Sequence, residues 1–543
     1  MTKKLLFCLI SAAFGVLSAS AYNVSTEVEK RNVLIEDFSG IYCGYCYQAA
    51  DIIEAICRNH EDVCAITMHA GHYAVPATDT KDLRTFDGNA IHDYFGISGY
   101  PSGTVNRIDQ GETIITPRSN WTSLTRDAVQ EDAVVNLYAA ASIDADRNLT
   151  VKVEGYYTGE PSNTENFLCV ALIESDVLSY QSGTSTGYEY PEQNVLRKYL
   201  SDVWGDKVDA AKGTYFEKEF SYTVPEIHDV MPGSVSMQED VIDLKGLEVV
   251  VYVLNNPKTE VLNATKVRPI LPEMEAPFAF KLKKPQIALD SRYGFNFFEA
   301  QFCNKSLEEA TAATFNVEIN DVTYTGTWNG SIAPLSDADI RISMPDNYVA
   351  DSQNSYLITL STVNGKEVEC EDRLYGVYMP PVEITPTINW TVKSDNKSGD
   401  QLWRIIDEDG NTVEQITFEE QGAAQTVTGT TTLEDGKSYC IEAYNPWGDG
   451  FTNMNPGETK TKNAEIHIAD AKGNEMVQVL KIKDFGGRAF FTTNSHAAVD
   501  EIAEDQKSAE FFNLQGVKRE QKNLAPGIYI KRQGQHSTKF IQK

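Results

Sequence analysis

The chain has 543 residues, of which 41% are hydrophobic, and it carries a formal net charge of −31 at pH 7. A chain of this length and composition can form roughly three to five domains with real cores. So acidic a protein repels phosphate backbones and anionic lipids, which argues against nucleic-acid binding and against direct binding to a membrane surface.

The first 21 residues have the pattern of a secretory signal peptide. Two lysines precede an apolar run over residues 5–17, and Ala19 and Ala21 place small residues before a predicted cleavage point. Cys8 lacks the small following residue that a lipoprotein cleavage site requires, so no lipid anchor is predicted. No other stretch reaches the ~18 apolar residues of a membrane span. We therefore expect an exported protein with no direct membrane span.

Eight cysteines remain after this segment, and four of them lie close together near the N-terminus. Export permits disulfides, but so few cysteines in so long a chain do not make a disulfide-dense framework. Cys57 and Cys64 flank a predicted helix-to-strand turn and could form a disulfide or remain two buried thiols. The eight are Cys43, Cys46, Cys57, Cys64, Cys169, Cys303, Cys370 and Cys440.

The first two of these cysteines form a CxxC motif that stands between a predicted strand and a predicted helix. Alternation and helical spacing of apolar residues predict the neighbouring elements, and a proline precedes the last strand. The predicted elements are a strand at 32–38, a helix at 48–58, a strand at 63–69, a helix at 85–96 and a strand within 98–107.

This order of elements resembles the thioredoxin fold. The resemblance implies that Cys43 is a nucleophilic thiolate at a helix N-terminus and that Cys46 resolves the mixed disulfide. It also implies that Asp37 is the buried acid that takes the proton of the resolving thiol. Pro101, after Tyr100, would be the cis-proline that faces the dithiol. The implied site residues are thus Cys43, Cys46, Asp37 and Pro101.

The motif departs from thioredoxin at three positions. The central dipeptide is Gly44-Tyr45, and Tyr42 stands where thioredoxins have tryptophan. Glu36 adjoins Asp37, so a one-residue bulge in the strand would exchange the acid that points inward.

Two other interpretations of the cysteine pair stay open. His69 and His72 complete a C-x2-C-x22-H-x2-H pattern, which superficially suits zinc. A permanently oxidised, purely structural pair is the other alternative. We expect neither a metal nor a cofactor.

After residue 130 the sequence becomes rich in alternating, strand-like segments. Together with the N-terminal part it resembles the outer-membrane protein 28-related family, over roughly residues 30–266. The resemblance implies a thioredoxin-like domain at 22–130 and a β-sandwich at 131–275. Its landmarks are LIEDFSGIYCGYC, YPSGTVNR, NVLR with its trailing WG, and VLNNPKTEVLNA.

Two further β-rich blocks follow, at 276–381 and 382–495. The first is predicted to be an Ig-like domain, in which Cys303 and Cys370 could be bridged, and the second a jelly-roll-like domain. Two features of the second block have alternative explanations. Its Asp-Gly clusters could bind calcium or simply form turns, and its aromatic residues could bind a glycan or pack in the core. The residues concerned are Asp407, Asp409, Asp449, Tyr444, Trp447 and Phe451.

The C-terminal part consists of a polar linker at 496–510 and a small β-rich tail at 511–543. The tail resembles the type A sorting domain of the type IX (Por) secretion system, on the segments NLQG, L-x-PGIY-I and a terminal KFI. The resemblance implies passage through the periplasm and display at the outer membrane or cell surface, with the type IX machinery as partner. The alternative is a small β-module that simply closes the chain.

The sequence therefore predicts a multidomain protein with an N-terminal α/β thioredoxin-like domain, β-sandwich modules and a small C-terminal β-module. Two functions fit it. One is thiol–disulfide exchange with thiol or disulfide protein substrates, and the other is a non-enzymatic adhesin or binding protein that uses the thioredoxin-like fold as a scaffold. Whether the protein is an enzyme is left open.

Overall fold

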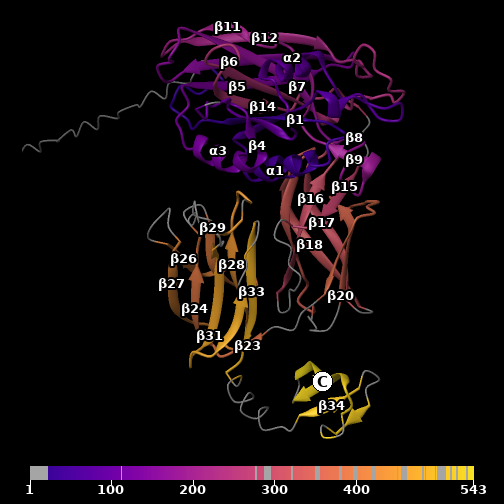
Figure 1. Ribbon diagram of the computed structural model, residues 1–543, viewed down its shortest axis with the longest axis vertical. Helices are drawn as coiled ribbons and strands as arrows, with labels where there is room; N and C mark the ends of the chain where they lie inside the picture. The colour runs from indigo at the N-terminus through magenta and orange to yellow at the C-terminus, as the bar shows by residue number, and fades with distance from the viewer. Residues whose placement is uncertain are drawn as a thin grey trace, which may run out of the picture. The chain divides into compact units, whose positions relative to one another are not determined.

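The computed structural model divides the chain into two compact units, Met1–Met274 and Glu275–Lys543 (Figure 1). The expected signal peptide, residues 1–21, lies outside the described residues. The structure describes 22–495 except 112, 275–277, 286–294, 320–321, 349–354, 378–381, 396–400, 419–423, 449, 454–461, 480–481 and 483–484, and also describes 497 and 509–542 except 514–516, 521, 523 and 534–535.

The first unit is built on a nine-stranded sheet with the order β14-β13-β7-β10-β2-β1-β3-β4, in which β11 also pairs with β7. Its strands come from both sides of residue 130, because β10 pairs with β2 at Val195 and Thr67. Two expected modules, 22–130 and 131–275, thus share one sheet. The strands are β1 (Val33–Ser39), β2 (Val63–His69), β3 (Ser102–Val105), β4 (Thr116–Pro117), β7 (Glu165–Glu174), β10 (Val195–Tyr199), β11 (Asp206–Asp209), β13 (Leu247–Leu254) and β14 (Val261–Val267).

Three helices pack on this sheet. The first contacts β1 and β2, the second contacts β2 and β10, and the third contacts β1 and β3. In Figure 1, α1 and α3 lie along the lower edge of the unit and α2 nearer its upper edge. The helices are α1 (Cys46–Asn59), α2 (Phe86–Phe95) and α3 (Trp121–Ala128), with short 3-10 turns η1 (His72–Ala74), η2 (Arg118–Asn120), η3 (Gly187–Glu189) and η4 (Leu244–Gly246).

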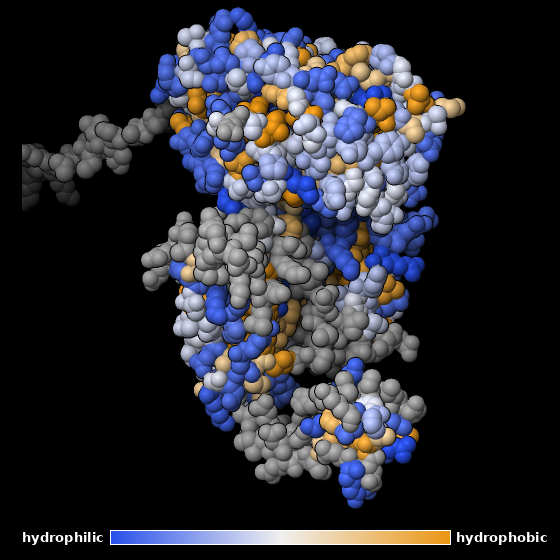
Figure 2. All heavy atoms as spheres, viewed as in Figure 1, coloured by the Kyte–Doolittle hydropathy of each residue, from blue (hydrophilic) through white to orange (hydrophobic). Residues whose placement is uncertain are grey.

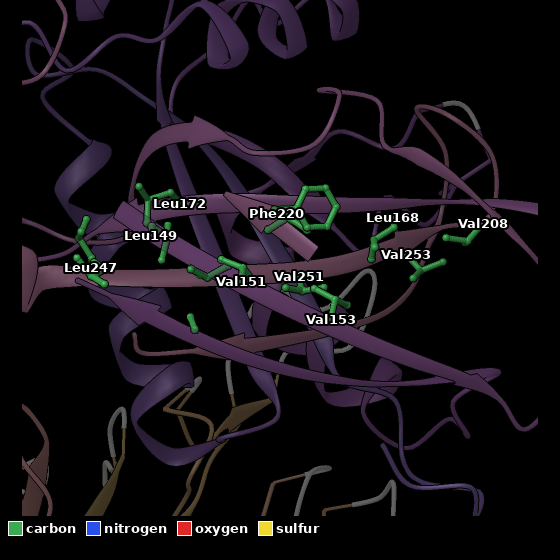
Figure 3. Packing of buried hydrophobic residues seen from close by; sticks show 14 of the residues in the cluster. Leu149, Val151, Val153, Leu168, Leu172, Val208, Phe220, Leu247, Val251 and Val253 are labelled. Carbon is green, nitrogen blue, oxygen red and sulfur yellow. The ribbon is translucent and has the colours of Figure 1, made fainter. Parts of the chain in front are cut away.

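The expected sandwich in this unit forms where β7 and β13 face a second sheet of order β12-β6-β5. Alternate residues of each strand point into the space between the sheets and fill it with Val, Leu and Phe side chains (Figure 3). The additional strands are β5 (Val135–Ile143), β6 (Asn148–Tyr157), β12 (Tyr215–Thr223) and the separate pair β8 (Val177–Ser179) and β9 (Tyr190–Glu192).

The second unit begins with an eight-stranded sheet, in which β18 and β19 are joined only at Thr327 and Ser343. The strands on either side of this joint enclose one apolar core, in which Phe302 and Phe315 are buried with ring centres 6.3 Å apart. The strands are β15 (Phe280–Lys283), β16 (Phe297–Asn304), β17 (Ala310–Ile319), β18 (Val322–Ile332), β19 (Asp337–Ser343), β20 (Ser355–Val363), β21 (Lys366–Glu367) and β22 (Arg373–Val377).

A second sandwich follows, with a five-stranded sheet of order β23-β33-β28-β25-β26 and a four-stranded sheet of order β27-β24-β31-β32. Trp403, Ile441 and Ile466 are among the residues buried between the two sheets. The strands of these two sheets are β23 (Val382–Ile384), β24 (Thr387–Lys393), β25 (Leu402–Asp407), β26 (Thr412–Ile416), β27 (Thr426–Thr432), β28 (Ser438–Tyr444), β31 (Glu465–Asp470), β32 (Glu475–Val479) and β33 (Gly486–Thr493), and β29 (Thr452–Asn453) and β30 (Lys462–Asn463) form a separate pair.

The tail forms its own four-stranded sheet, β35-β34-β36-β37, and its described strands pair only with one another. Phe511 is buried there, with its ring centre 5.0 Å from that of Phe540. The strands are β34 (Glu510–Phe512), β35 (Lys518–Arg519), β36 (Gly527–Gln533) and β37 (His536–Gln542). The chain is therefore mostly β-structure in several sheets, with few helices, as the sequence predicts.

Hydrophilic residues cover most of the face shown in Figure 2, and hydrophobic residues appear there in small groups. This distribution fits the high net charge. Among the described residues, no helix is both long enough and apolar enough to cross a membrane.

Candidate functional site

Cys43 and Cys46 form a disulfide at the start of α1, with their Cα atoms 5.5 Å apart. This separation lies in the usual range for a disulfide. Both residues are buried, with exposed fractions of 3% for Cys43 and 1% for Cys46. The partial positive charge of the helix N-terminus would stabilise a Cys43 thiolate when the pair is reduced.

Every residue of β1 is buried. Because successive side chains of a strand point to opposite faces of the sheet, Glu36 and Asp37 lie on opposite faces. Glu36 points toward the face of Leu34 and Phe38. There it accepts hydrogen bonds from Arg107, at 2.7 Å from Nε and 2.6 Å from Nη2, and from Thr104. No bulge interrupts the pairing of β1 with β2 or β3. The register therefore gives Glu36 a partner and leaves Asp37 for the other face.

Asp37 lies on the face that α1 and α3 cover, in register with Thr67 and Gly103. It is buried, and neither carboxylate oxygen has a hydrogen-bond partner among the described residues. Burial raises the pKa of Asp37 from 3.8 to about 8. A carboxyl group with a pKa near neutral can both donate and accept a proton at physiological pH.

Two further titratable groups lie on this face. His69 Nε2 is 3.6 Å from Glu192 Oε2, and both side chains are buried. Burial, and then the nearby Asp37 carboxyl, raise the pKa of Glu192 well above its usual range. Burial, and then Arg197, lower the pKa of His69 to about 3. Because all three groups favour their neutral forms, the site tolerates little net charge.

Sequence reasoning missed Glu192, which comes from β9, far along the chain. It reaches the site because Thr67 N–H donates to the Asn194 carbonyl oxygen at 2.7 Å, which attaches the start of β10 to β2. No local pattern marks Glu192, since its position depends on strand pairing over a long sequence separation.

The peptide bond between Tyr100 and Pro101 is cis, as the thioredoxin resemblance implied. Pro101 directly precedes β3, whose first residue, Ser102, pairs with Phe38 on β1. The Tyr100 hydroxyl is hydrogen-bonded to His92 Nε2, so His92 is a buried histidine with a partner.

The remaining cysteines among the described residues are free thiols. Cys57 and Cys64 are therefore not bridged, and burial raises their pKa values to about 11 and about 12. Cys303 and Cys370 are not bridged either. High pKa values make such thiols poor nucleophiles, which leaves Cys43 and Cys46 as the candidate reactive pair.

The calcium and zinc alternatives find no support among the described residues, where no group of three or more His, Cys, Asp or Glu side chains could hold a metal ion. Asp407 Oδ1 accepts hydrogen bonds from the backbone of Asp409 and Asn411, so it closes a turn. Asp449 lies outside the described residues.

The glycan-binding alternative loses two of its three aromatic residues. Trp447 and Phe451 are buried in the second sandwich, and only Tyr444 lines a cavity. These two rings are buried because their large apolar surfaces are more stable in the core than in water.

The family model described as outer membrane protein Omp28 matches residues 88–270, about a third of the chain. Over these residues the chain is similar to the Omp28 family, and we call residues 88–270 the Omp28-related segment. The Omp28-related segment starts in α2 and includes Pro101, β9 and the sandwich, whereas the cysteine pair precedes it. No curated protein matches the chain.

Two solved structures from Porphyromonas gingivalis are similar to parts of the chain. HBP35 has 16% identity and a TM-score of 0.32, and the match covers 64% of this chain and 98% of that one. A domain of the outer membrane lipoprotein Omp28 has 20% identity and a TM-score of 0.18, and the match covers 26% of this chain and 92% of that one. Both TM-scores are too low to define the fold or activity of this chain.

Proposed function

We propose that this is an exported protein of the outer membrane or cell surface that carries out thiol–disulfide exchange at Cys43 and Cys46. The observation that carries the proposal is the disulfide at the start of α1 on the same sheet face as the unpartnered, buried Asp37. The strand order β2-β1-β3-β4, with the cysteines after β1 and Pro101 before β3, supports a thioredoxin-like arrangement. The Omp28-related segment supports the location.

The proposed oxidation begins when a substrate thiolate attacks Cys43 Sγ and breaks the Cys43–Cys46 bond. Cys46 leaves as a thiolate and takes the proton that Asp37 holds. A second substrate thiolate then attacks the substrate sulfur of the mixed disulfide, and Cys43 leaves as a thiolate. The substrate gains a disulfide and the protein keeps the two electrons as a dithiol. Reduction of a substrate runs through the same steps in reverse, with Asp37 accepting the Cys46 proton.

Replacing each cysteine in turn tests this proposal. Cys43→Ser is expected to lower the rate of insulin disulfide reduction to the background, because the attacking sulfur is lost. Cys46→Ser should instead accumulate a mixed disulfide that mass spectrometry detects, since nothing resolves it. Cys57→Ser is the matched control and should react like the parent protein. If Cys43→Ser retained the activity, the proposal would be wrong.

A surface binding protein is the second candidate function, and one observation favours it. The second unit holds a cavity of about 220 Å³, and strands of its eight-stranded sheet and of its five-stranded sheet line this cavity. In its wall Arg488 bridges Glu299 and Glu442, and Arg404 also pairs with Glu442. Full absence of thiol exchange in the parent protein would favour this candidate.

We propose further that the tail, 511–543, is a sorting module read by type IX secretion machinery. Its separate four-stranded sheet supports the proposal, because a signal must be readable while the rest of the chain is folded.

Deleting residues 511–543 is expected to leave the protein in the periplasm with its circular dichroism spectrum otherwise preserved. Cell fractionation and surface proteolysis would measure the change. The control is a variant in which an unrelated folded tag replaces the tail. Surface display of the truncated protein would contradict the proposal.

A further inference from the structure

A short segment of the Omp28-related part lies alongside the cysteine loop. Ser182 N–H donates to the carbonyl oxygen of Ile41 at 2.8 Å, and Gln181 Nε2 donates to the carbonyl oxygen of Cys43 at 2.8 Å. We call residues 180–183 the strap. Hydrogen bonds to main-chain carbonyl oxygens are one way in which an extended segment docks against another.

The strap is closely packed against the loop as well as hydrogen-bonded to it. A Cβ atom added to Gly183 would lie 2.5 Å from the carbonyl oxygen of Gly44 and 3.0 Å from the ring of Tyr47. The rings of Tyr180 and Tyr42 are 5.4 Å apart at the other end of the strap. The strap therefore follows the whole loop that carries Cys43.

The position of the strap affects which thiols can reach the disulfide. Exchange requires a thiolate to touch a sulfur of the disulfide, and only 3% of Cys43 is exposed. A low-molecular-weight thiol can reach the sulfur through a narrow opening. A cysteine in a folded protein needs more space, because the surface around that cysteine must also fit against this protein. The strap lies against the loop that carries Cys43, so a folded protein that approached Cys43 from this side would have to displace it.

Building on the proposed exchange activity, we propose that the strap selects substrates by size. Low-molecular-weight thiols and disulfides react at Cys43 while the strap is in place, and protein disulfides react only once it moves. The strap is thus a specificity-determining segment that the Omp28-related part adds to the dithiol.

Gly183→Ala tests the proposal, with Gly187→Ala as its matched control. Both glycines have a positive φ, +88° and +56°, so alanine strains the backbone at either position. Only at Gly183 does the added methyl group collide with the cysteine loop. At Gly187 no described atom lies within 4 Å of the added Cβ. The difference between the variants therefore reports the displacement of the strap.

The measurement is the ratio of two rate constants of the reduced protein, one with insulin and one with oxidised glutathione. Gly183→Ala is expected to raise this ratio about tenfold, since overpacking opens the closed arrangement. Gly187→Ala should leave the ratio within about twofold. Gln181→Leu, which removes the bond to Cys43, should raise it by a smaller factor.

The outcomes separate the two proposals. If the parent protein reacts with neither disulfide, the exchange function is wrong and the strap proposal fails with it. If it reacts with oxidised glutathione and Gly183→Ala leaves the ratio unchanged, only the strap proposal fails. A second measurement does not depend on exchange. In a Cys46→Ser background, Gly183→Ala should speed alkylation of Cys43 by a maleimide on polyethylene glycol more than by N-ethylmaleimide, and equal acceleration would overturn the proposal.

Discussion

Replacing Asp37 by asparagine is expected to stabilise the folded, oxidised protein at neutral pH and to slow thiol–disulfide exchange. The stability effect follows from the pKa of about 8 in the folded state, against 3.8 for the exposed carboxyl. Below pH 3.8 the carboxyl group is protonated in both the folded and the unfolded state, so its ionisation does not affect the free energy of unfolding. Between pH 3.8 and 8 the unfolded chain releases the proton while the folded protein retains it, so Asp37 increasingly destabilises the fold. Above pH 8 this penalty is constant.

At pH 7 the substitution should therefore raise the free energy of unfolding by an amount on the order of 4 kcal/mol more than it does at pH 4. Thermal unfolding of the oxidised protein at both pH values measures the difference. Glu61→Gln, which changes an exposed acid on the same unit, is the control. An equal effect at pH 4 and pH 7 would mean that Asp37 is ionised in the folded protein.

The same variant should exchange disulfides about 100-fold more slowly at pH 7, because asparagine cannot take the proton from Cys46. The loss should shrink at high pH, where the Cys46 thiol ionises without help. Stopped-flow kinetics with a small disulfide would follow both trends. A variant that is more stable and equally active would show that Asp37 is a buried acid with no part in proton transfer.

Replacing Arg107 by methionine is expected to cost about 3–5 kcal/mol of stability. The side chains of Arg107 and Glu36 are both fully buried, and they form an ion pair with each other. Without the guanidinium group, the Glu36 carboxylate keeps only the hydrogen bond from Thr104 in a medium that solvates charge poorly. The guanidinium also lies over the Phe95 ring, 5.2 Å from its centre, so a cation–π contact is lost with the charge.

Urea unfolding of the parent protein and three variants would measure this effect. The double variant Arg107→Met with Glu36→Gln should be more stable than Arg107→Met alone, because no unpaired charge remains buried. Lys207→Ala is the control, since Lys207 and Glu165 form an ion pair with side chains 66% and 57% exposed. It should cost less than about 1 kcal/mol. A loss below this value in Arg107→Met would show that the buried pair contributes little.

The sequence predicted the local elements around the cysteines with small errors. The strand predicted at 63–69 is β2, and the helix predicted at 48–58 is α1, which begins two residues earlier. Apolar alternation and helical spacing are local signals, and neighbouring residues generate them without the rest of the chain. Helix α3 was not predicted, because it has only 8 residues and two of its buried residues, Thr122 and Thr125, are threonines, so no long apolar repeat marks it.

The sequence by itself also determined the chemistry that is available, through the CxxC pair, an acid six residues before it and the proline after Tyr100. Only the tertiary structure decided which acid has a partner, because the sheet register turns Glu36 toward Arg107 and leaves Asp37 on the opposite face. Only the tertiary structure brought Glu192 and the strap to the cysteines. The physical reason is that these contacts join strands and loops more than 100 residues apart, and pairing over such separations depends on packing that no local pattern of residues records.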